Sequence, residues 1–360
     1  MKFKMLTVFM FQTYFGFGQF KFQINGTNST LIISQKIFVK YKSPSDINYK
    51  SYKDDSCQIK NGKFTFLYDA KEPVLDFQFI IGNRIHYILI DSGITNVSIK
   101  KSTRNKKNYQ LIFSPSKSND LFVRMNELEV NERKGFKLSS EQNTSKVLNF
   151  SNIKRRAELS EIIKYPQDYY SLIRLYDISF HLNTARFNEI NSAFIKLSQK
   201  NRILPIGLLL NQRIKNAFAL LPDKDLPFFS FSSLDGQHIT NKNFINDKVI
   251  FFFYATWCGP CKKIIPILKS MNEKFNKEIK FVMINLDENK GEWKKIISKF
   301  QINGLMNLTD ESPMIESSNA ANLLIDAVPQ FMFSKNNKIV FKGILSDFEK
   351  NEILINFLNK

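Results

Sequence analysis

"YATWCGPCKKIIP", Tyr254–Pro266, is the most informative segment for the fold of the C-terminal part of this 360-residue chain. It continues an unbroken apolar run, "KVIFFF", and carries two cysteines, Cys258 and Cys261, that are separated by two residues. An apolar run without alternation is typical of a central strand that is buried on both faces. The stretch therefore predicts a strand that leads into a helix, with both cysteines at the start of the helix.

The start of a helix favours the ionised form of a cysteine thiol. The first turn of a helix has free N–H groups and the positive end of the helix dipole, and both stabilise a thiolate. We therefore expect Cys258 to be an exposed nucleophile and Cys261, one turn later, to reach back to it. Gly259 and Pro260 lie between them, and proline is tolerated here because its missing N–H would have been unpaired. Trp257 is expected to shape and partly shield the site. The predicted chemistry is thiol–disulfide exchange.

A metal site and a pair of structural core thiols are the alternatives for these cysteines. Zinc needs four ligands, usually from two CxxC pairs or from one CxxC pair and two histidines. The remaining candidate ligands are scattered along the chain: Cys57, His86, His181 and His238. The sequence therefore predicts neither a metal nor an organic cofactor, and the position of the motif at a strand–helix junction favours a redox pair over core thiols.

The elements around the motif follow a known order. "FFSFSSLDGQHIT" reads as a hairpin with its turn at Asp235-Gly236, "IKFVMINLD" as a buried strand and "KGEWKKIISKF" as a helix. "AVPQFMFS", "NN" and "KIVFKG" read as strand, turn and strand before a final amphipathic helix. Strand–helix–strand–helix–strand–strand–helix predicts a thioredoxin-like α/β domain over residues 222–360, with a central mixed sheet flanked by helices.

A second signal in this domain is the dipeptide Val328-Pro329. In a thioredoxin fold a cis proline precedes the strand that faces the CxxC pair, and Pro329 directly precedes "QFMFS". A cis bond would leave the backbone of Val328 free to pair with an extended substrate. An ordinary turn proline is the alternative.

The rest of the chain divides by its periodicity. Residues 19–100 contain short alternating segments separated by turn residues, which predicts a small all-β sandwich or barrel. Residues 101–221 carry apolar residues at intervals of three and four, which predicts a helical connecting region. "PDKDLP" then reads as a linker.

Residues 1–18 are typical of a signal peptide: "MKFK" is basic, "MLTVFMFQTYF" is apolar, and Gly16 and Gly18 offer a cleavage site. A buried strand or an uncleaved anchor is the alternative. Export would place the protein in the periplasm or outer cell envelope, where disulfide chemistry is meaningful.

The formal net charge of +19 and a pI near 9.6 would suit nucleic acid or an anionic membrane surface. The lysines are spread along the chain and no nucleic-acid-binding module accompanies them, so we predict no nucleic-acid partner. Peripheral membrane association stays open.

Residues 224–360 resemble the TlpA/ResA-like thioredoxin family of exported bacterial thiol–disulfide oxidoreductases. The likeness is carried by "FSSLDGQHITNKNFINDKVIFFFYATWCGPCKKIIPIL", "INLDENKGEWKKII" and "AVPQFMFSKNNKIVFKG". It implies Cys258 as nucleophile, Cys261 as resolving thiol and Pro329 as the cis proline. It also implies a disulfide-bearing protein substrate and a membrane thiol–disulfide carrier as electron donor. The Gly-Pro dipeptide between the cysteines is that of reducing thioredoxins, which favours a reductase.

The sequence departs from this pattern at two positions. The family often has Glu at the position of Ile264, and cytoplasmic thioredoxins have a buried Asp at that of Phe252. Proton transfer would then use water, Lys262 or Lys263, or exchange would be slower. Residues 20–100 also resemble the β-rich domain of unknown function that often precedes such modules.

Three other functions compete with this interpretation. "LIDSG", Leu89–Gly93, resembles an aspartic-protease loop, but such sites need two Asp residues and Asp91 has no second copy, so a hairpin turn explains it better. A binding or scaffold protein with a vestigial thioredoxin fold is the main alternative. A peroxidase is disfavoured because the loop before Cys258 lacks its Thr/Pro-rich sequence. Cys57 is expected to be a lone, half-buried thiol.

Overall fold

The structure is a computed structural model that describes residues 20–28, 36–46, 52–81, 84–101, 109–135, 144–180, 184–344 and 351–359. The predicted signal peptide, residues 1–18, lies outside this part. The chain divides into two compact units. The first is Met1–Gly135 with Asp168–Tyr170, and the second is Phe136–Gln167 with Ser171–Lys360.

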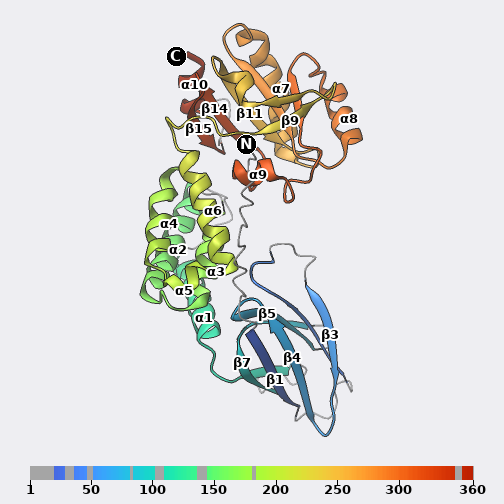
Figure 1. The fold of residues 1–360 in the computed structure, drawn as a ribbon, viewed down its shortest axis with the longest axis vertical. Helices are drawn as coiled ribbons and strands as arrows, with labels where there is room; N and C mark the ends of the chain where they lie inside the picture. Colours follow the sequence, from blue (N-terminus) through green and yellow to red (C-terminus); the bar gives the residue numbers. More distant parts are fainter. Residues whose placement is uncertain are drawn as a thin grey trace, which may run out of the picture. The chain divides into compact units, whose positions relative to one another are not determined.

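The first unit is a sandwich of two four-stranded sheets with orders β4-β1-β7-β8 and β3-β2-β5-β6 (Figure 1). All strand pairs are antiparallel except β1–β7. One apolar cluster between the sheets takes residues from both, as a sandwich requires. The strands are β1 (Phe20–Asn28), β2 (Lys36–Lys42), β3 (Lys53–Gln58), β4 (Lys63–Ala70), β5 (Val74–Ile81), β6 (Arg84–Asp91), β7 (Gly93–Lys101) and β8 (Tyr109–Phe113).

Strand β4 shows why these segments form a sandwich. In "KFTFLYDA" the side chains of Phe64, Phe66 and Tyr68 are buried and the residues between them are exposed, so one face of the strand meets the core. The preceding turn uses Asn61 and Gly62, both with positive φ (52° and 70°), which is the geometry of a tight two-residue hairpin.

The β-rich part extends beyond the predicted end at residue 100. Strand β8 lies within the segment that the sequence predicted to be helical, and helix α1 (Lys117–Gly135) follows it in the same unit. The short run "YQLIF" is apolar at two-residue intervals and pairs with β7, so the sheet captures it. The domain boundaries at 100/101 and 221/222 stay predictions.

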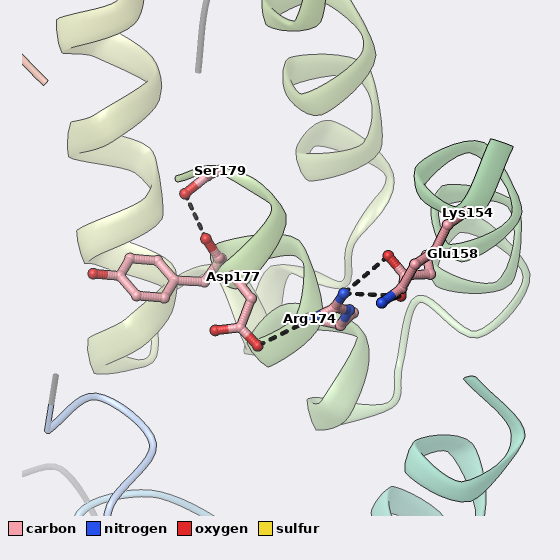
Figure 2. Close-up of polar contacts among 6 residues, drawn as sticks. Lys154, Glu158, Arg174, Asp177 and Ser179 are labelled. Atoms are coloured by element: carbon pink, nitrogen blue, oxygen red, sulfur yellow. Dashed lines mark hydrogen bonds and ion pairs between the residues drawn. The ribbon is translucent and has the colours of Figure 1, made fainter. Parts of the chain in front are cut away.

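The second unit begins with a group of helices: α2 (Thr144–Lys164), α3 (Tyr169–Ile178), α4 (Thr184–Lys196), α5 (Gln199–Arg202) and α6 (Pro205–Ala219). A charge cluster joins α2 to α3 (Figure 2). Arg174 donates two hydrogen bonds to the buried carboxylate of Glu158, at 2.8 and 3.0 Å, and Lys154 lies 3.9 Å from the same carboxylate. The helical character predicted for this segment is confirmed.

The C-terminal part of the second unit has a seven-stranded mixed sheet with the order β10-β9-β13-β12-β11-β14-β15. β11, β12 and β13 are parallel, and the remaining pairs are antiparallel. The strands are β9 (Ser230–Ser233), β10 (His238–Thr240), β11 (Lys248–Tyr254), β12 (Lys280–Asn285), β13 (Met306–Thr309), β14 (Gln330–Lys335) and β15 (Lys338–Gly343). The helices are η2 (Asn241–Phe244), α7 (Gly259–Phe275), α8 (Lys290–Phe300), α9 (Ser318–Asn322) and α10 (Glu352–Asn359).

The predicted order of elements is therefore present, with three additions that the sequence did not reveal, η2, β13 and α9. Strand β11 is buried on both faces, as its apolar run predicted. One of its faces joins a core cluster with α7, α8 and α10, and the other carries Phe251, which packs against Phe229 and Phe244. The sheet thus has packed layers on both sides (Figure 1). The end of β11 leads through a short loop into the start of α7. In the described part of the chain, no helix is both long and apolar enough to cross a bilayer.

Candidate active site

Cys258 and Cys261 are joined by a disulfide bond at the start of α7, with their Cα atoms 5.3 Å apart. Cys258 is the N-cap residue of the helix, and its Sγ accepts the backbone N–H of Cys261 at 3.1 Å. Pro260 lies in the first turn. A helix N-terminus therefore directs a free N–H group at the sulfur of Cys258, which is the arrangement that stabilises a thiolate.

The two cysteines are more enclosed than the sequence predicted. Cys258 is 4% exposed and Cys261 is fully buried, so the expected exposed nucleophile is only the more accessible member of the pair in this disulfide form. Both sulfurs belong to the core cluster under α7, which explains the burial. Trp257, by contrast, is 65% exposed, and Gly259 is exposed with open space around its Cα.

The Val328–Pro329 bond is cis, as expected. The side chain of Val328 packs against the same apolar cluster that contains both cysteines. Strand β14, which follows directly, pairs with β11 so that Phe331 lies opposite Phe252. Val328 lies about 70 residues after the cysteines in the chain, and the fold brings its side chain to the apolar cluster that contains them.

The surroundings of Cys261 are apolar. Phe252 is fully buried between Tyr254 and Phe331, with ring centroids 5.7 and 4.9 Å away, and Ile264 packs against the same cluster. The titratable residue in this cluster is Tyr254, and burial raises the pKa of its hydroxyl further above the ordinary value. The positions of the two missing acids are therefore filled by apolar side chains that pack with this cluster.

Asp287 is a residue of the site that the sequence analysis missed. Its buried carboxylate accepts the backbone N–H of Thr256 at 2.6 Å and the side-chain amide of Asn285 at 2.7 Å. Thr256 lies two residues before Cys258, so the end of β12 holds the loop that leads into the CxxC motif. An Asp two residues after the end of a buried parallel strand was the available signal, because the carboxyl ends of neighbouring parallel strands meet at one edge of the sheet.

A cleft of about 360 Å³ lies next to this loop. Exposed apolar side chains of Trp257 and Ile315 line it, and Glu288 is exposed at its wall. The lining contains two carboxylates and no basic residue, in a chain with 52 basic and 33 acidic residues. The complete lining is Thr256, Trp257, Leu286, Asp287, Glu288, Asn289, Pro313, Met314 and Ile315.

Asp91 has a structural role in the first unit. Its carboxylate accepts hydrogen bonds from the hydroxyl of Ser116 at 2.7 Å and the N–H of Ser118 at 3.3 Å, and so it holds the start of α1. A second carboxyl group, Asp168, bonds the hydroxyl of Ser118, and its pKa is raised by burial and, to a smaller degree, by Asp91. The sequence analysis did not find this neighbour. Serines lie between the two acids, and both acids cap backbone N–H groups.

Three of the four remaining candidate ligands lie within the described residues. Cys57 is a free, half-buried thiol that packs against the core of the sandwich, as predicted. His86 and His238 lie on β6 and β10, and His181 lies outside the described residues. Within the described ranges, no group of three or more His, Cys, Asp or Glu side chains could hold a metal ion.

Two family models match the chain. Residues 237–309 match thioredoxin, and residues 22–122 match a domain of unknown function, DUF4369. The first match contains the CxxC motif, Asp287 and β13. The second covers the whole described β-sandwich except the first residues of β1, and it reaches into α1.

Curated relatives agree with the first match. The chain is 39% identical over 57 residues to Thioredoxin Y, chloroplastic, of Oryza sativa, which is 16% of this chain and 32% of that protein. It is 23% identical over 118 residues to the thiol-disulfide oxidoreductase ResA of Bacillus thuringiensis, 32% of this chain and 66% of that protein. The chain thus spans between about a third and two thirds of the length of these relatives.

Among solved structures, a thiol-disulfide oxidoreductase from Bacteroides fragilis aligns at 23% identity and a TM-score of 0.34, covering 38% of this chain and 98% of that one. The sheet order, the CxxC disulfide at the start of α7 and the thioredoxin model match rest on independent observations. The C-terminal part of this chain therefore has a thioredoxin fold and contains the match to thioredoxin, and the part before it contains the match to DUF4369.

Proposed function

We propose that this protein is an exported thiol–disulfide oxidoreductase that reduces protein disulfides through Cys258 and Cys261. The observation that carries the proposal is the Cys258–Cys261 disulfide at a helix N-terminus, where Sγ of Cys258 accepts the N–H of Cys261. A sulfur in this position is a stabilised leaving group when the disulfide is reduced and a stabilised thiolate afterwards. The Gly-Pro dipeptide supports the reducing direction, and residues 1–18 support export.

The proposed cycle starts from the reduced pair. The Cys258 thiolate attacks one sulfur of the substrate disulfide, forms a mixed disulfide and releases the other substrate sulfur as a thiolate, which takes a proton from water. Cys261 loses its proton and attacks Sγ of Cys258, which re-forms the Cys258–Cys261 disulfide and releases the second substrate thiolate. Two electrons pass from the pair to the substrate, and a dithiol donor must return them.

The site residues have the following proposed roles. Cys258 is the nucleophile and Cys261 the resolving thiol. Trp257, Gly259 and Pro260 shape the approach, while Val328 and Pro329 form the opposite wall. Because Asp and Glu are not present at positions 252 and 264, the proton of Cys261 leaves through water or through Lys262 or Lys263.

We infer a disulfide-bearing protein as substrate and a membrane thiol–disulfide carrier as electron donor. The exposed apolar walls of the cleft at Trp257 and Ile315 support a polypeptide substrate, because they would otherwise face water. The formal charge of +19 is compatible with peripheral association with an anionic membrane on the side where such a donor lies.

The reduction potential of the Cys258–Cys261 pair tests the proposal. The full chain is equilibrated with thiol–disulfide buffers, quenched with an alkylating reagent and analysed by mass. A potential near about −270 mV would support a reductase, and one near about −120 mV would contradict the reducing direction in favour of an oxidant.

A non-catalytic binding or scaffold protein is the second candidate. The exposed apolar residues on the outer faces of the sandwich, such as Leu67 and Ile94, favour it because they resemble an interaction surface. A pair that exchanges with no buffer, or a full chain that does not turn over a disulfide substrate with dithiothreitol as donor, would favour this candidate.

A further inference from the structure

The loop between α9 and β14 leads directly to Val328 and Pro329. Its residues Leu323, Leu324 and Ile325 are buried, and Asp326 follows with a side chain that is only 9% exposed. A buried carboxylate must be paired, because burying an unpaired charge is costly. The partners of Asp326 therefore decide where this loop lies.

Arg213, on α6 of the helical region, is the partner of Asp326. Its Nη2 lies 2.7 Å from Oδ2 of Asp326, and its side chain is 13% exposed. The same guanidinium donates to the hydroxyl and the carbonyl oxygen of Ser179, each at 3.1 Å, and lies over the ring of Phe180 at 4.4 Å. Four contacts of a rigid, planar group therefore leave Asp326 little freedom to move.

Two neighbouring contacts reinforce this connection. Asn216, one turn further along α6, donates to the carbonyl oxygen of Ala321 on α9 at 3.3 Å. Lys342 on β15 donates to the carbonyl oxygen of Leu324 at 3.0 Å. The helical region and the last hairpin thus hold the loop at residues 321, 324 and 326, immediately before the proposed substrate-binding residues.

We propose that Arg213 is a positioning residue for disulfide exchange, which fixes Val328 and Pro329 beside the disulfide by binding Asp326. The proposal rests on the proposed function of Cys258 and Cys261. It gives the helical region, which the sequence analysis described only as a connecting region, a role in holding the substrate-binding loop. Val328 is the link, because its side chain packs against the cluster that holds both cysteines.

The position of the loop predicts that Arg213 affects substrate binding and not the redox chemistry of the cysteines. The loop would contact an extended polypeptide, whereas a small disulfide needs only the cysteines. Loss of Arg213 should therefore weaken binding of a protein disulfide while it leaves the redox pair unchanged.

The test compares the full chain with Arg213→Met, Arg213→Lys and Asp326→Asn. Each variant is assayed with insulin as protein disulfide and hydroxyethyl disulfide as small substrate, with dithiothreitol as donor. We expect Arg213→Met to raise KM for insulin about tenfold, with kcat, the rate with hydroxyethyl disulfide and the reduction potential nearly unchanged. Arg213→Lys, which keeps the charge but not the planar fork, should recover part of the loss.

Arg155→Met is the matched control. Arg155 is a similarly buried arginine of the helical region, 12% exposed, and its Nε lies 3.2 Å from Glu189, away from the loop. It should leave KM unchanged. Equal KM values for folded Arg213→Met and wild type, or an equal rise in Arg155→Met, would overturn the proposal. If Arg213→Met does not fold, Asp326→Asn gives the same comparison. A wild-type chain that reduces neither substrate would instead overturn the proposed function.

Discussion

At the scale of single residues, the two cysteines differ in their surroundings. Sγ of Cys258 accepts an N–H group at the helix start, and Cys261 is fully buried in apolar surroundings. Sγ of Cys258 can therefore attack a substrate disulfide. Sγ of Cys261 is buried and can attack only the mixed disulfide that forms on Cys258. This asymmetry is the physical basis for assigning the nucleophile and the resolving thiol to different positions.

Cys261→Ser should accumulate a mixed disulfide between Cys258 and a protein substrate, because the sulfur that resolves it is missing. The adduct is detected as a mass increase on a non-reducing gel that dithiothreitol removes. Cys258→Ser is the control and should form far less adduct, since Cys261 is buried. Equal trapping by both variants would contradict the assignment of roles.

Lys342 gives a prediction about pH. Its pKa is lowered to about 8, chiefly by burial, while Asp326 opposes the shift and Arg213 adds to it. The protonated form is thus disfavoured in the folded state. As pH rises from about 8 to 10.5, the folded protein has lost a proton that the unfolded chain still holds, so folding becomes more favourable.

The free energy of unfolding of the wild type, relative to Lys342→Met, should therefore increase by about 3 kcal/mol between pH 8 and 10.5. Urea unfolding at a series of pH values measures it. Lys338→Met, an exposed lysine on the same strand, is the control and should show no such trend. If the difference in the free energy of unfolding between the wild type and Lys342→Met does not change with pH, folding does not disfavour the ammonium group of Lys342.

At the scale of elements, strand β12 stabilises the loop before α7 through one carboxylate. Asp287 accepts two N–H groups, from Thr256 and Asn285, and both are buried or half-buried. The parallel pairing of β11 and β12 places these groups at the same sheet edge. The segment after β12 therefore holds the loop that precedes the CxxC motif.

Asp287→Ala should lower the free energy of unfolding by about 2 kcal/mol or more, because two donors lose their acceptor. Denaturant unfolding measures the change. Asp225→Ala is the control: its carboxylate is 70% exposed in a surface ion pair with Lys338, and its loss should cost less than about 1 kcal/mol. Similar losses in both variants would mean that the loop does not depend on Asp287.

At the scale of the whole molecule, the chain has two compact units, and only the second contains the disulfide. Each unit has its own apolar cluster, one in the sandwich and one under α7. Units with separate cores can unfold in separate cooperative steps.

Calorimetry of the full chain should therefore show two transitions, and dithiothreitol should lower the temperature of only one of them, because opening the Cys258–Cys261 ring frees the unfolded chain of a constraint. The Cys258→Ser/Cys261→Ser double variant is the control and should not respond to dithiothreitol. A single transition that shifts as a whole would contradict the independence of the two units.

The thioredoxin-like fold, the CxxC pair, the cis proline and the β-rich N-terminal part could be predicted from the sequence, because each has a local signature, whereas the choice between a sandwich and a barrel could not. The run "KVIFFF" predicted the central strand, the CxxC spacing predicted one helical turn between the sulfurs, and alternation as in "KFTFLYDA" predicted strands with one buried face. The sequence did not predict three short elements with weak periodicity, because their conformation depends on their neighbours in the sheet or core. These elements are β8, β13 and α9.

Which distant residues support the site depends on how the elements pack and could not be predicted from the sequence. Asp287 reaches the loop at Thr256, and Arg213 meets Asp326 across 113 positions of the chain. The separation of the two residues in the sequence predicts neither contact, since a side-chain contact between separate elements depends on how whole layers pack. The burial of Cys258 was likewise invisible in the sequence, because the exposure of a residue at the start of a helix depends on the core beneath that helix.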